Sequence, residues 1–257
     1  MIGDYRVEMV DAVGSSWDAI VATFDDVCLE QTASYMGPRW DYSRLAGLVL
    51  RDAATDQPIA AALAVIAMLP MLNVGLACVK FGPLWRRKGH AAEPGVLVAA
   101  LETAKQVFAA NRGLVARVMP PPDPGSETAW SDALGCAGYT LHAAMPDSER
   151  YMVDLTLSEK AQLASLGASW RANLNKARRN NLTIREVDLR EGLPDFIALY
   201  QAMLARKQFV DRHAAEYLPA FAAAAPPELG ARLFLASDDS SFVNGEILVA
   251  DGGWTAG

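Results

Sequence analysis

The chain has 257 residues, of which 52% are hydrophobic and 21% are charged, close to the usage of ordinary globular proteins. This length allows one large domain or two modest ones, each with its own buried core. The net charge of −7 argues against a protein that binds nucleic acid over its whole surface, but it is compatible with a local basic patch.

The three cysteines, Cys28, Cys78 and Cys136, lie far apart and form no pair with the CxxC spacing of a zinc site. The three histidines are also scattered, so we predict no metal site. A sparse, odd set of cysteines suits a reducing cytosol better than a disulfide framework. The N-terminus lacks the pattern of a signal peptide, and the most apolar run, residues 59–72, is too short to cross a bilayer. We therefore expect a cytoplasmic protein without a transmembrane segment.

The first half of the chain alternates between strand and helix patterns. Apolar residues from Trp17 to Val27 recur at helical spacing, which predicts a helix that Ser15 or Ser16 caps and that runs to about Thr32. Two apolar runs flank a turn-like segment and predict a β-hairpin. The hairpin strands are predicted at 47–51 and 59–69, and another strand follows at 74–81. The elements predicted after these are a helix at 93–111, a strand at 114–119, a proline-rich break at 120–125, a short helix at 130–134 and a strand at 139–143.

The second half repeats this coarse order of strands and helices. Its predicted elements are a strand at 151–155, a helix that Ser158 caps, a helix at 168–180, a strand at 182–187, helices at 194–207 and 217–224, and strands at 232–236 and 246–250. Strands alternating with amphipathic helices predict an α/β (α+β) fold with a mixed sheet flanked by helices. The repeated order hints at a weak duplication, with units at residues 1–150 and 151–257.

A concentrated set of positive charges lies on the helix predicted at residues 168–180. Arg171, Asn175 and Arg178 follow one face of it, and Lys176 and Arg179 form a second basic pair. A positive face in a net-acidic protein suits a phosphate-bearing ligand, such as tRNA or the pyrophosphate of a nucleotide sugar or lipid. The structural alternative is an amphipathic helix whose charged face is simply solvated.

A neighbouring face of the same helix is apolar. Trp170, Leu174 and Ala177 recur at helical spacing along it. We expect Trp170 and Leu174 to anchor the helix in the core, which would hold the arginine side chains in place.

Four features, in this order, resemble the Fem-type peptidoglycan-bridge transferases and their relatives in the GNAT superfamily. They are Gly82-Pro83 after an apolar strand, the strand at 114–120 before a proline-rich loop, the segment at 151–155, and residues 170–182, which have an Arg, a Lys-Ala pair and a polar turn before a strand. The resemblance covers about residues 1–235 and implies two GNAT-like units, the second of them incomplete.

The resemblance also implies an activity, the transfer of an acyl or aminoacyl group to an amine, including that of a cell-envelope precursor. The co-substrate would be acyl-CoA or aminoacyl-tRNA, with no tightly bound cofactor. By position, Arg171 would contact the phosphates of a small-molecule or lipid-linked acceptor, with Lys176 and Arg178 as further substrate-binding candidates. No catalytic residue is identified: Asp154 and Glu186 are candidate bases by residue type, and a structural role is the favoured interpretation of each.

The loop at residues 82–89 is basic and precedes a predicted helix. In acetyl-CoA-dependent GNAT proteins a glycine-rich turn at a helix N-terminus holds the pyrophosphate through backbone N–H groups. This loop lacks their Q/R-x-x-G-x-G/A pattern, so we favour a structural turn with a basic rim.

The last residues, about 234–257, resemble a different family, the C-terminus of short-chain dehydrogenases/reductases. The glycine-rich phosphate loop and the Tyr-x-x-x-Lys pair of that family are missing from the rest of the chain. The tail looks foreign from about Ala236, where it would truncate the second unit. Two alternatives to a transferase therefore stay open: a non-catalytic module that binds a phosphate ligand or tRNA, and an NAD(P)-dependent reductase, which only the tail supports.

Overall fold

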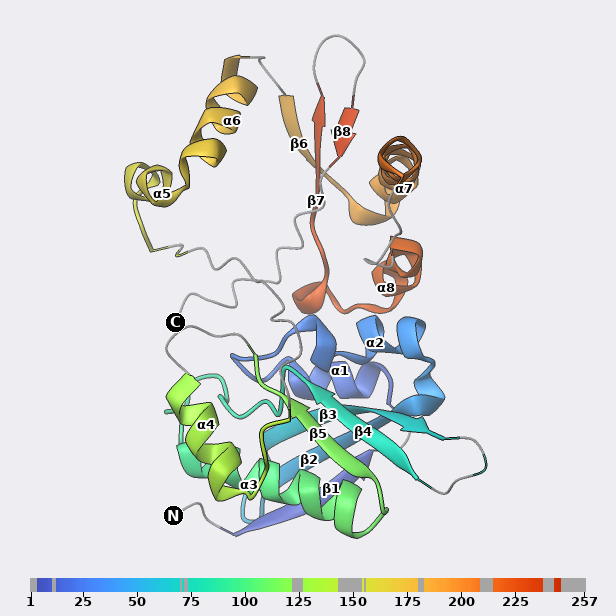
Figure 1. Ribbon diagram of the computed structural model, residues 1–257, viewed down its shortest axis with the longest axis vertical. Helices are drawn as coiled ribbons and strands as arrows, with labels where there is room; N and C mark the ends of the chain where they lie inside the picture. Colours follow the sequence, from blue (N-terminus) through green and yellow to red (C-terminus); the bar gives the residue numbers. More distant parts are fainter. Residues whose placement is uncertain are drawn as a thin grey trace. The chain divides into compact units, whose positions relative to one another are not determined.

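The computed structural model describes residues 4–10, 13–69, 71, 74–121, 127–142, 154, 156–179, 183–208, 215–237 and 243–245. The chain divides into two compact units, Met1–Arg150 and Tyr151–Gly257, each of which has its own sheet (Figure 1).

The first unit is built on a five-stranded mixed sheet with the order β1-β2-β3-β4-β5. Its strands are β1 (Tyr5–Val10), β2 (Leu45–Asp52), β3 (Pro58–Met68), β4 (Gly75–Lys80) and β5 (Val115–Met119). Neighbours pair antiparallel except for β4 and β5, which are parallel. The predicted hairpin, the strand after it, the strand at 114–119 and the predicted α/β (α+β) fold class are confirmed.

The helix predicted from Ser15 to about Thr32 is wrong in its length and its cap. The chain forms α1 (Ser15–Val21), a 3₁₀ turn η1 (Leu29–Gln31) and α2 (Ala33–Trp40), followed by the 3₁₀ turn η2 (Tyr42–Arg44). Gly14 occupies the N-cap position of α1 without a side-chain hydrogen bond. The helix ends early because Phe24 forms an isolated bridge with Arg87, and Asp26 turns to accept two backbone N–H groups. These tertiary contacts outweigh the local helical periodicity.

A helical crossover joins β4 to β5 (Figure 1). It consists of α3 (Pro94–Ala104) and a π-helical turn η3 (Lys105–Ala110), and α4 (Glu127–Cys136) follows β5. The strand predicted at 139–143 is wrong over residues 139–142, which form no strand. Tyr139 instead packs beside α3, where its hydroxyl donates to the carbonyl of Leu101 at 3.1 Å and burial raises its pKa to about 12.

The two faces of the five-stranded sheet pack differently. Alternate strand residues such as Leu48 and Ala62 form the main core with Leu97, Leu101 and Phe108 of the helical crossover. On the opposite face the fully buried ring of Trp17 lies so close to Gly47 that a Cβ atom there would come within 2.5 Å of it. Helices α1 and α2 contact the sheet at β3 and β2, respectively.

The second unit contains a three-stranded antiparallel sheet with the order β6-β7-β8. Its elements are α5 (Glu159–Ser165), α6 (Ala168–Arg179), β6 (Thr183–Val187), α7 (Leu189–Lys207), η4 (Ala215–Tyr217), α8 (Leu218–Ala224), η5 (Pro227–Leu229), β7 (Leu233–Ser237) and β8 (Val243–Gly245). Ser158 caps α5 as predicted, because its hydroxyl accepts from the N–H of Ala161 at 3.3 Å. The strand predicted at 246–250, and that at 151–155 apart from Asp154, lie outside the described residues.

The core of the second unit is small. Leu193 and Phe196 of α7 pack with Ala222 of α8 and with Leu233 and Leu235 of β7. Among the described residues, none of the helices combines the length and the apolar composition needed to cross a lipid bilayer.

Candidate functional site

Helix α6 carries the basic face that the sequence predicts, but the helix itself buries none of its residues. Leu174 is half-buried, whereas 59% of the surface of Trp170 is exposed. The expectation that Trp170 anchors the helix in a core is therefore wrong. The neighbouring helix α5 spans only seven residues and buries none of its own, so it is too short to cover the whole apolar face of α6.

Two of the three predicted substrate-binding residues contact α5. Arg171 donates through Nη1 to the carbonyl oxygens of Ala164, at 3.1 Å, and Leu166, which lie at the C-terminal end of α5. Arg178 forms an ion pair with Glu159 at the N-terminal end of α5, with 3.2 Å between Nη2 and Oε1. The two arginines thus hold both ends of α5, and their side chains remain exposed to solvent.

The third predicted residue, Lys176, lies with Arg179 on another face of α6. Both side chains are exposed and have no hydrogen-bond or ion-pair partner among the described residues. Lys176, Arg178 and Arg179 all lie in the last turn of α6, where positive charge favours the negative end of the helix dipole. As far as the described part of the chain shows, this twelve-residue helix thus carries two cations without a partner and two that are already hydrogen-bonded.

The two carboxylates considered as general bases are both engaged locally. Asp154 accepts from the N–H and the hydroxyl of Thr156, at 2.9 and 2.6 Å, and these hydrogen bonds lower its pKa. Glu186 forms a two-point ion pair with Arg232, with 2.7 Å between Oε1 and Nε, and this pairing lowers its pKa. A lowered pKa makes a carboxylate a weaker base, so the structural interpretation is the better one for both.

The basic loop after β4 is held by the carboxylate of Asp26. The N–H groups of Trp85 and Arg86 donate to its two oxygens at 3.0 and 3.1 Å, and Leu84 pairs with Ala61 of β3. Burial raises the pKa of Asp26, although these hydrogen bonds and the charge of Arg86 act in the opposite direction. Since the loop's N–H groups at these two positions are used by Asp26, the structure agrees with a structural turn.

The start of α3 is poorly suited to hold a phosphate. Pro94 is its first residue and has no N–H, and the N–H of Val96 is taken by the carbonyl of Glu93 at 2.8 Å. Glu93, at the N-cap, adds a negative charge to the same turn. Anion sites at helix N-termini depend on free N–H groups and on the positive end of the helix dipole. The N-terminus of α3 offers few free N–H groups.

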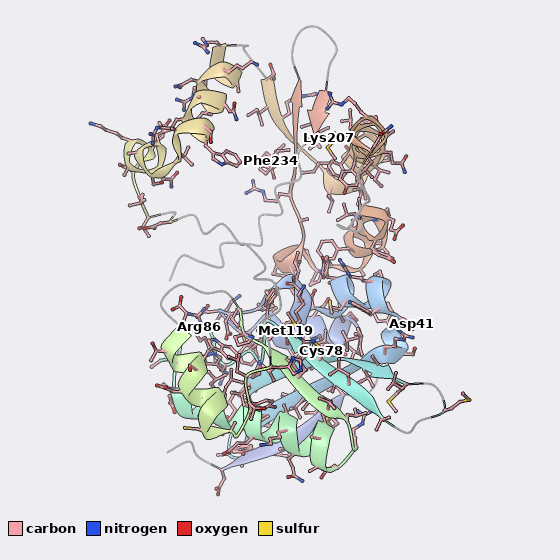
Figure 2. The ribbon with its side chains drawn as sticks, in the orientation of Figure 1. Asp41, Cys78, Arg86, Met119, Lys207 and Phe234 are labelled. Atoms are coloured by element: carbon pink, nitrogen blue, oxygen red, sulfur yellow. The ribbon has the colours of Figure 1, made fainter. Side chains whose placement is uncertain are left out.

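One pair of charged residues was missed by the sequence interpretation. By the register of the two strands, Lys80 of β4 and Arg117 of β5 lie on the sheet face that carries Cys78 and Met119. Figure 2 labels the last two residues. The available signal was the alternation of β5, in which a charged residue stands between Val115 and Met119 at the period of a strand. Among the described residues, no three His, Cys, Asp or Glu side chains lie together as metal ligands would.

No protein-family model matches the sequence, and no curated protein matches it. Among solved structures, FemX superposes with a TM-score of 0.64 at 19% identity; the match covers 89% of this chain and 57% of the FemX chain. A possible acetyltransferase from Clostridium difficile 630 (11% identity, 58% of this chain and 99% of that one) and an aminoglycoside acetyltransferase from an uncultured soil metagenomic sample (19% identity, 56% and 99%) have TM-scores of 0.39 and 0.36, too low to support a conclusion. Over most of its described length, the chain has the fold of FemX.

Proposed function

We propose that this chain is an N-acyltransferase or aminoacyltransferase of the Fem/GNAT type that acts in the cytoplasm on an amine of a phosphate-bearing acceptor. The observation that carries the proposal is the FemX fold, which covers 89% of the chain with a TM-score of 0.64. The acceptor would be a small molecule or a lipid-linked cell-envelope precursor. The chain spans 57% of the FemX chain, so the activity of a complete FemX-like protein is itself part of the proposal.

The proposed reaction needs positioning more than reactive side chains. An uncharged amine attacks a carbonyl carbon and the C–N bond forms. The bond to the tRNA ribose oxygen or to the CoA sulfur then breaks, and the proton lost by the nitrogen passes, directly or through water, to that oxygen or sulfur. Orientation of the two substrates and stabilisation of the oxyanion supply most of such an acceleration. Within the described ranges Lys176 and Arg179 have no partner and could contact phosphates, and Arg171 and Arg178 have N–H donors beyond those that bind α5.

The start of α3 favours aminoacyl-tRNA over acyl-CoA as the donor. Pro94 has no N–H to offer the pyrophosphate of CoA and Glu93 adds a negative charge beside it, whereas the exposed cations of α6 suit a polynucleotide backbone. The exposed ring of Trp170, on the same helix, offers a flat surface on which an unpaired base stacks.

A non-catalytic module that binds tRNA or another phosphate ligand is the second candidate. It is favoured by the engagement of Asp154 and Glu186 in local contacts, which leaves neither as an obvious base. The reductase alternative rests only on the tail, of which residues 238–242 and 246–257 lie outside the described residues. It stays a prediction without structural support.

Transfer can be tested directly with the purified full chain. The chain is incubated with ¹⁴C-aminoacyl-tRNA or ¹⁴C-acyl-CoA and with a lysine-containing peptide joined to a nucleotide diphosphate sugar, and label in the peptide is counted. We expect transfer from aminoacyl-tRNA, and its rate should fall about tenfold or more in the double variant Lys176→Ala, Arg179→Ala, because two charge-assisted contacts are lost. The double variant Arg112→Ala, Arg206→Ala, which removes two other exposed cations, serves as the matched control.

The outcomes separate the candidates. Saturable tRNA binding without any transfer would support the binding module. Transfer from acyl-CoA alone would contradict the donor assignment but keep the transferase. Oxidation of NAD(P)H in the presence of a carbonyl compound would support the reductase instead.

A further inference from the structure

One face of the β4–β5 pair is polar where the opposite face forms the core. The parallel register sets Cys78 beside Arg117 and Lys80 beside Met119. A separation of 4.0 Å between Cys78 Sγ and Met119 Sδ puts these two side chains on the same face, and Figure 2 labels both residues. Residues alternate along a strand, so Lys80 and Arg117 share this face as well.

The intervening residues of both strands belong to the core of the first unit; they are Ala77, Val79, Ala116 and Val118. The polar face is less covered, because Cys78, Lys80, Arg117 and Met119 are all half-buried and Val115 is 67% exposed. This end of the sheet therefore presents charged side chains to solvent on a rigid strand pair rather than on a loop.

The two cations lie near the thiol. Burial raises the pKa of Cys78, while the charges of Arg117 and Lys80 act in the opposite direction, which places both within electrostatic range of the sulfur. Lys80 is held by an ion pair with Glu30, at 3.3 Å, and its ammonium lies 4.8 Å from the centre of the Phe81 ring. The position of Lys80 is thus fixed by contacts outside the β5 strand.

Arg117 differs from every other lysine and arginine of the described residues. It alone is half-buried and has neither a hydrogen-bond nor an ion-pair partner within that part of the chain. A guanidinium carries five N–H donors in a planar fork, and partial burial removes some of the water that would otherwise accept from them. A ligand with two oxygen atoms would restore those hydrogen bonds in a bidentate pair.

We propose that Arg117 and Lys80 form a binding site for the oxyanion group of a small molecule, either a carboxylate or a phosphate, on the sheet face beside Cys78. Arg117 supplies the bidentate contact, and Lys80, while paired with Glu30, offers its other N–H donors. Cys78 and Met119 give the adjoining part of the ligand a polarisable, weakly polar surface. The proposed site does not depend on the proposed function.

Cys78 provides a local reporter of occupancy. Its alkylation by iodoacetamide can be followed by peptide mass spectrometry at constant ionic strength, while inorganic phosphate or N-acetylalanine is titrated as the phosphate or carboxylate source. Because a bound anion covers the thiol and offsets the cations that favour the thiolate, the rate at Cys78 should fall saturably, by about threefold or more, with the preferred source. The exposed Cys136 should not respond.

Arg117→Gln should abolish this protection, and Arg112→Gln, which removes an exposed cation from the turn before β5, should preserve it. Equal protection in Arg117→Gln or at Cys136, or no saturable protection by either anion, would overturn the proposal. If Arg117→Gln fails to fold, Arg117→Lys serves instead and should bind more weakly because the fork is lost. If Cys78 reacts too slowly to follow, the melting temperature is measured with each anion instead. It should rise saturably in the unaltered chain and not in Arg117→Gln.

Transfer activity is measured separately in the same variants. Anion protection of Cys78 without any transfer would keep this site and contradict the proposed function. If transfer persists in Arg117→Gln and anions do not protect Cys78 in the unaltered chain, the proposed function is kept and this site is contradicted.

Discussion

Gln31 pairs with Leu63 as a neighbouring strand would. Its side-chain Oε1 accepts from the N–H of Leu63 at 2.8 Å, and its Nε2 donates to the carbonyl of the same residue at 3.3 Å. The Nε2 also donates to the carbonyl of Lys80 at 2.7 Å. One fully buried side chain thus satisfies three backbone groups from two strands.

This amide fills the interval in which β4 separates from β3. The regular ladder stops at the pair of Ala64 and Val79, and the next pairing joins Ala61 to Leu84. Gly82 lies between these points, and a Cβ atom there would come within 2.8 Å of the Gln31 amide. The Gln31 side chain therefore replaces the ladder hydrogen bonds that the separation removes.

Replacement of Gln31 by Leu should destabilise the first unit strongly. The change keeps an apolar side chain of similar size but leaves buried backbone groups of Leu63 and Lys80 without partners, at about 1–3 kcal/mol for each orphaned group. The free energy of unfolding, measured by urea denaturation, should fall by about 3 kcal/mol or more. Gln106→Leu, at an exposed position, is the control and should change it by less than about 1 kcal/mol. A comparable small loss in both variants would contradict the role assigned to Gln31.

The half-buried carboxyl of Asp26 should make stability depend on pH. Burial raises its folded-state pKa above the ordinary 3.8, so its contribution is fully present below about pH 4 and is lost as the pH rises through the folded pKa. Asp26→Asn removes this titration. The unfolding free energy of the unaltered chain minus that of the variant should therefore decrease from about pH 4 upward and then level off. Urea denaturation across a pH series measures the difference, with the exposed Asp25→Asn as the baseline; an increase with pH would contradict the prediction.

The ion pair of Glu186 and Arg232 predicts the opposite dependence. Arg232 lowers the pKa of Glu186 below the ordinary 4.5, so the pair stabilises the second unit above that value and loses its effect as the pH falls through the lowered pKa. Arg232→Gln should return the pKa of Glu186 toward 4.5. Carbon-13 NMR titration of the Glu186 carboxyl measures this directly. Arg185→Gln, which removes an exposed cation from β6, should leave the titration where it was, and an unmoved midpoint in Arg232→Gln would refute the pairing.

Arg171 should affect both ligand binding and local structure. Arg171→Ala is expected to weaken binding of tRNA by about 10–100-fold, the range for loss of one charge-assisted hydrogen bond. The same change removes the donor that contacts Ala164 and Leu166, so amide hydrogens of α5 should exchange faster. Fluorescence anisotropy at fixed salt and hydrogen exchange read the two effects separately, with Arg206→Ala as the control. Normal binding with faster exchange would assign Arg171 to the support of α5 alone.

Elements with a strong local pattern were predictable from the sequence. The hairpin of β2 and β3, the strand β4 and the helix α3 each have an uninterrupted apolar pattern of the right period and length. The helix predicted to Thr32 failed because Asp26 and Phe24 pair with residues some 60 positions away, near Arg86 and Arg87. No local pattern in the sequence predicts such long-range contacts.

The candidate sites divide in the same way. The basic face of α6 was predictable because its residues are close in sequence, but its loose packing was not, since Trp170 had been expected in a core. Gln31, in the 3₁₀ turn η1, shows no local signal at all, because its partners lie on the strands β3 and β4. Arg117 had one, a charge within an apolar strand, but only the structure shows that it lacks a hydrogen-bond or ion-pair partner among the residues described.

The sheet order of the first unit has a kinetic consequence. β2, β3 and β4 follow one another in sequence and pair with their immediate neighbours, whereas β1 and β5 reach the sheet only across intervening helical segments. Longer loops cost more entropy to close, so we expect the three central strands to associate first during folding and the two outer strands to dock later. In the native state the order should reverse: the backbone amides of the outer strands should open most readily, and those of Leu48 and Leu63 should stay protected until the whole unit unfolds.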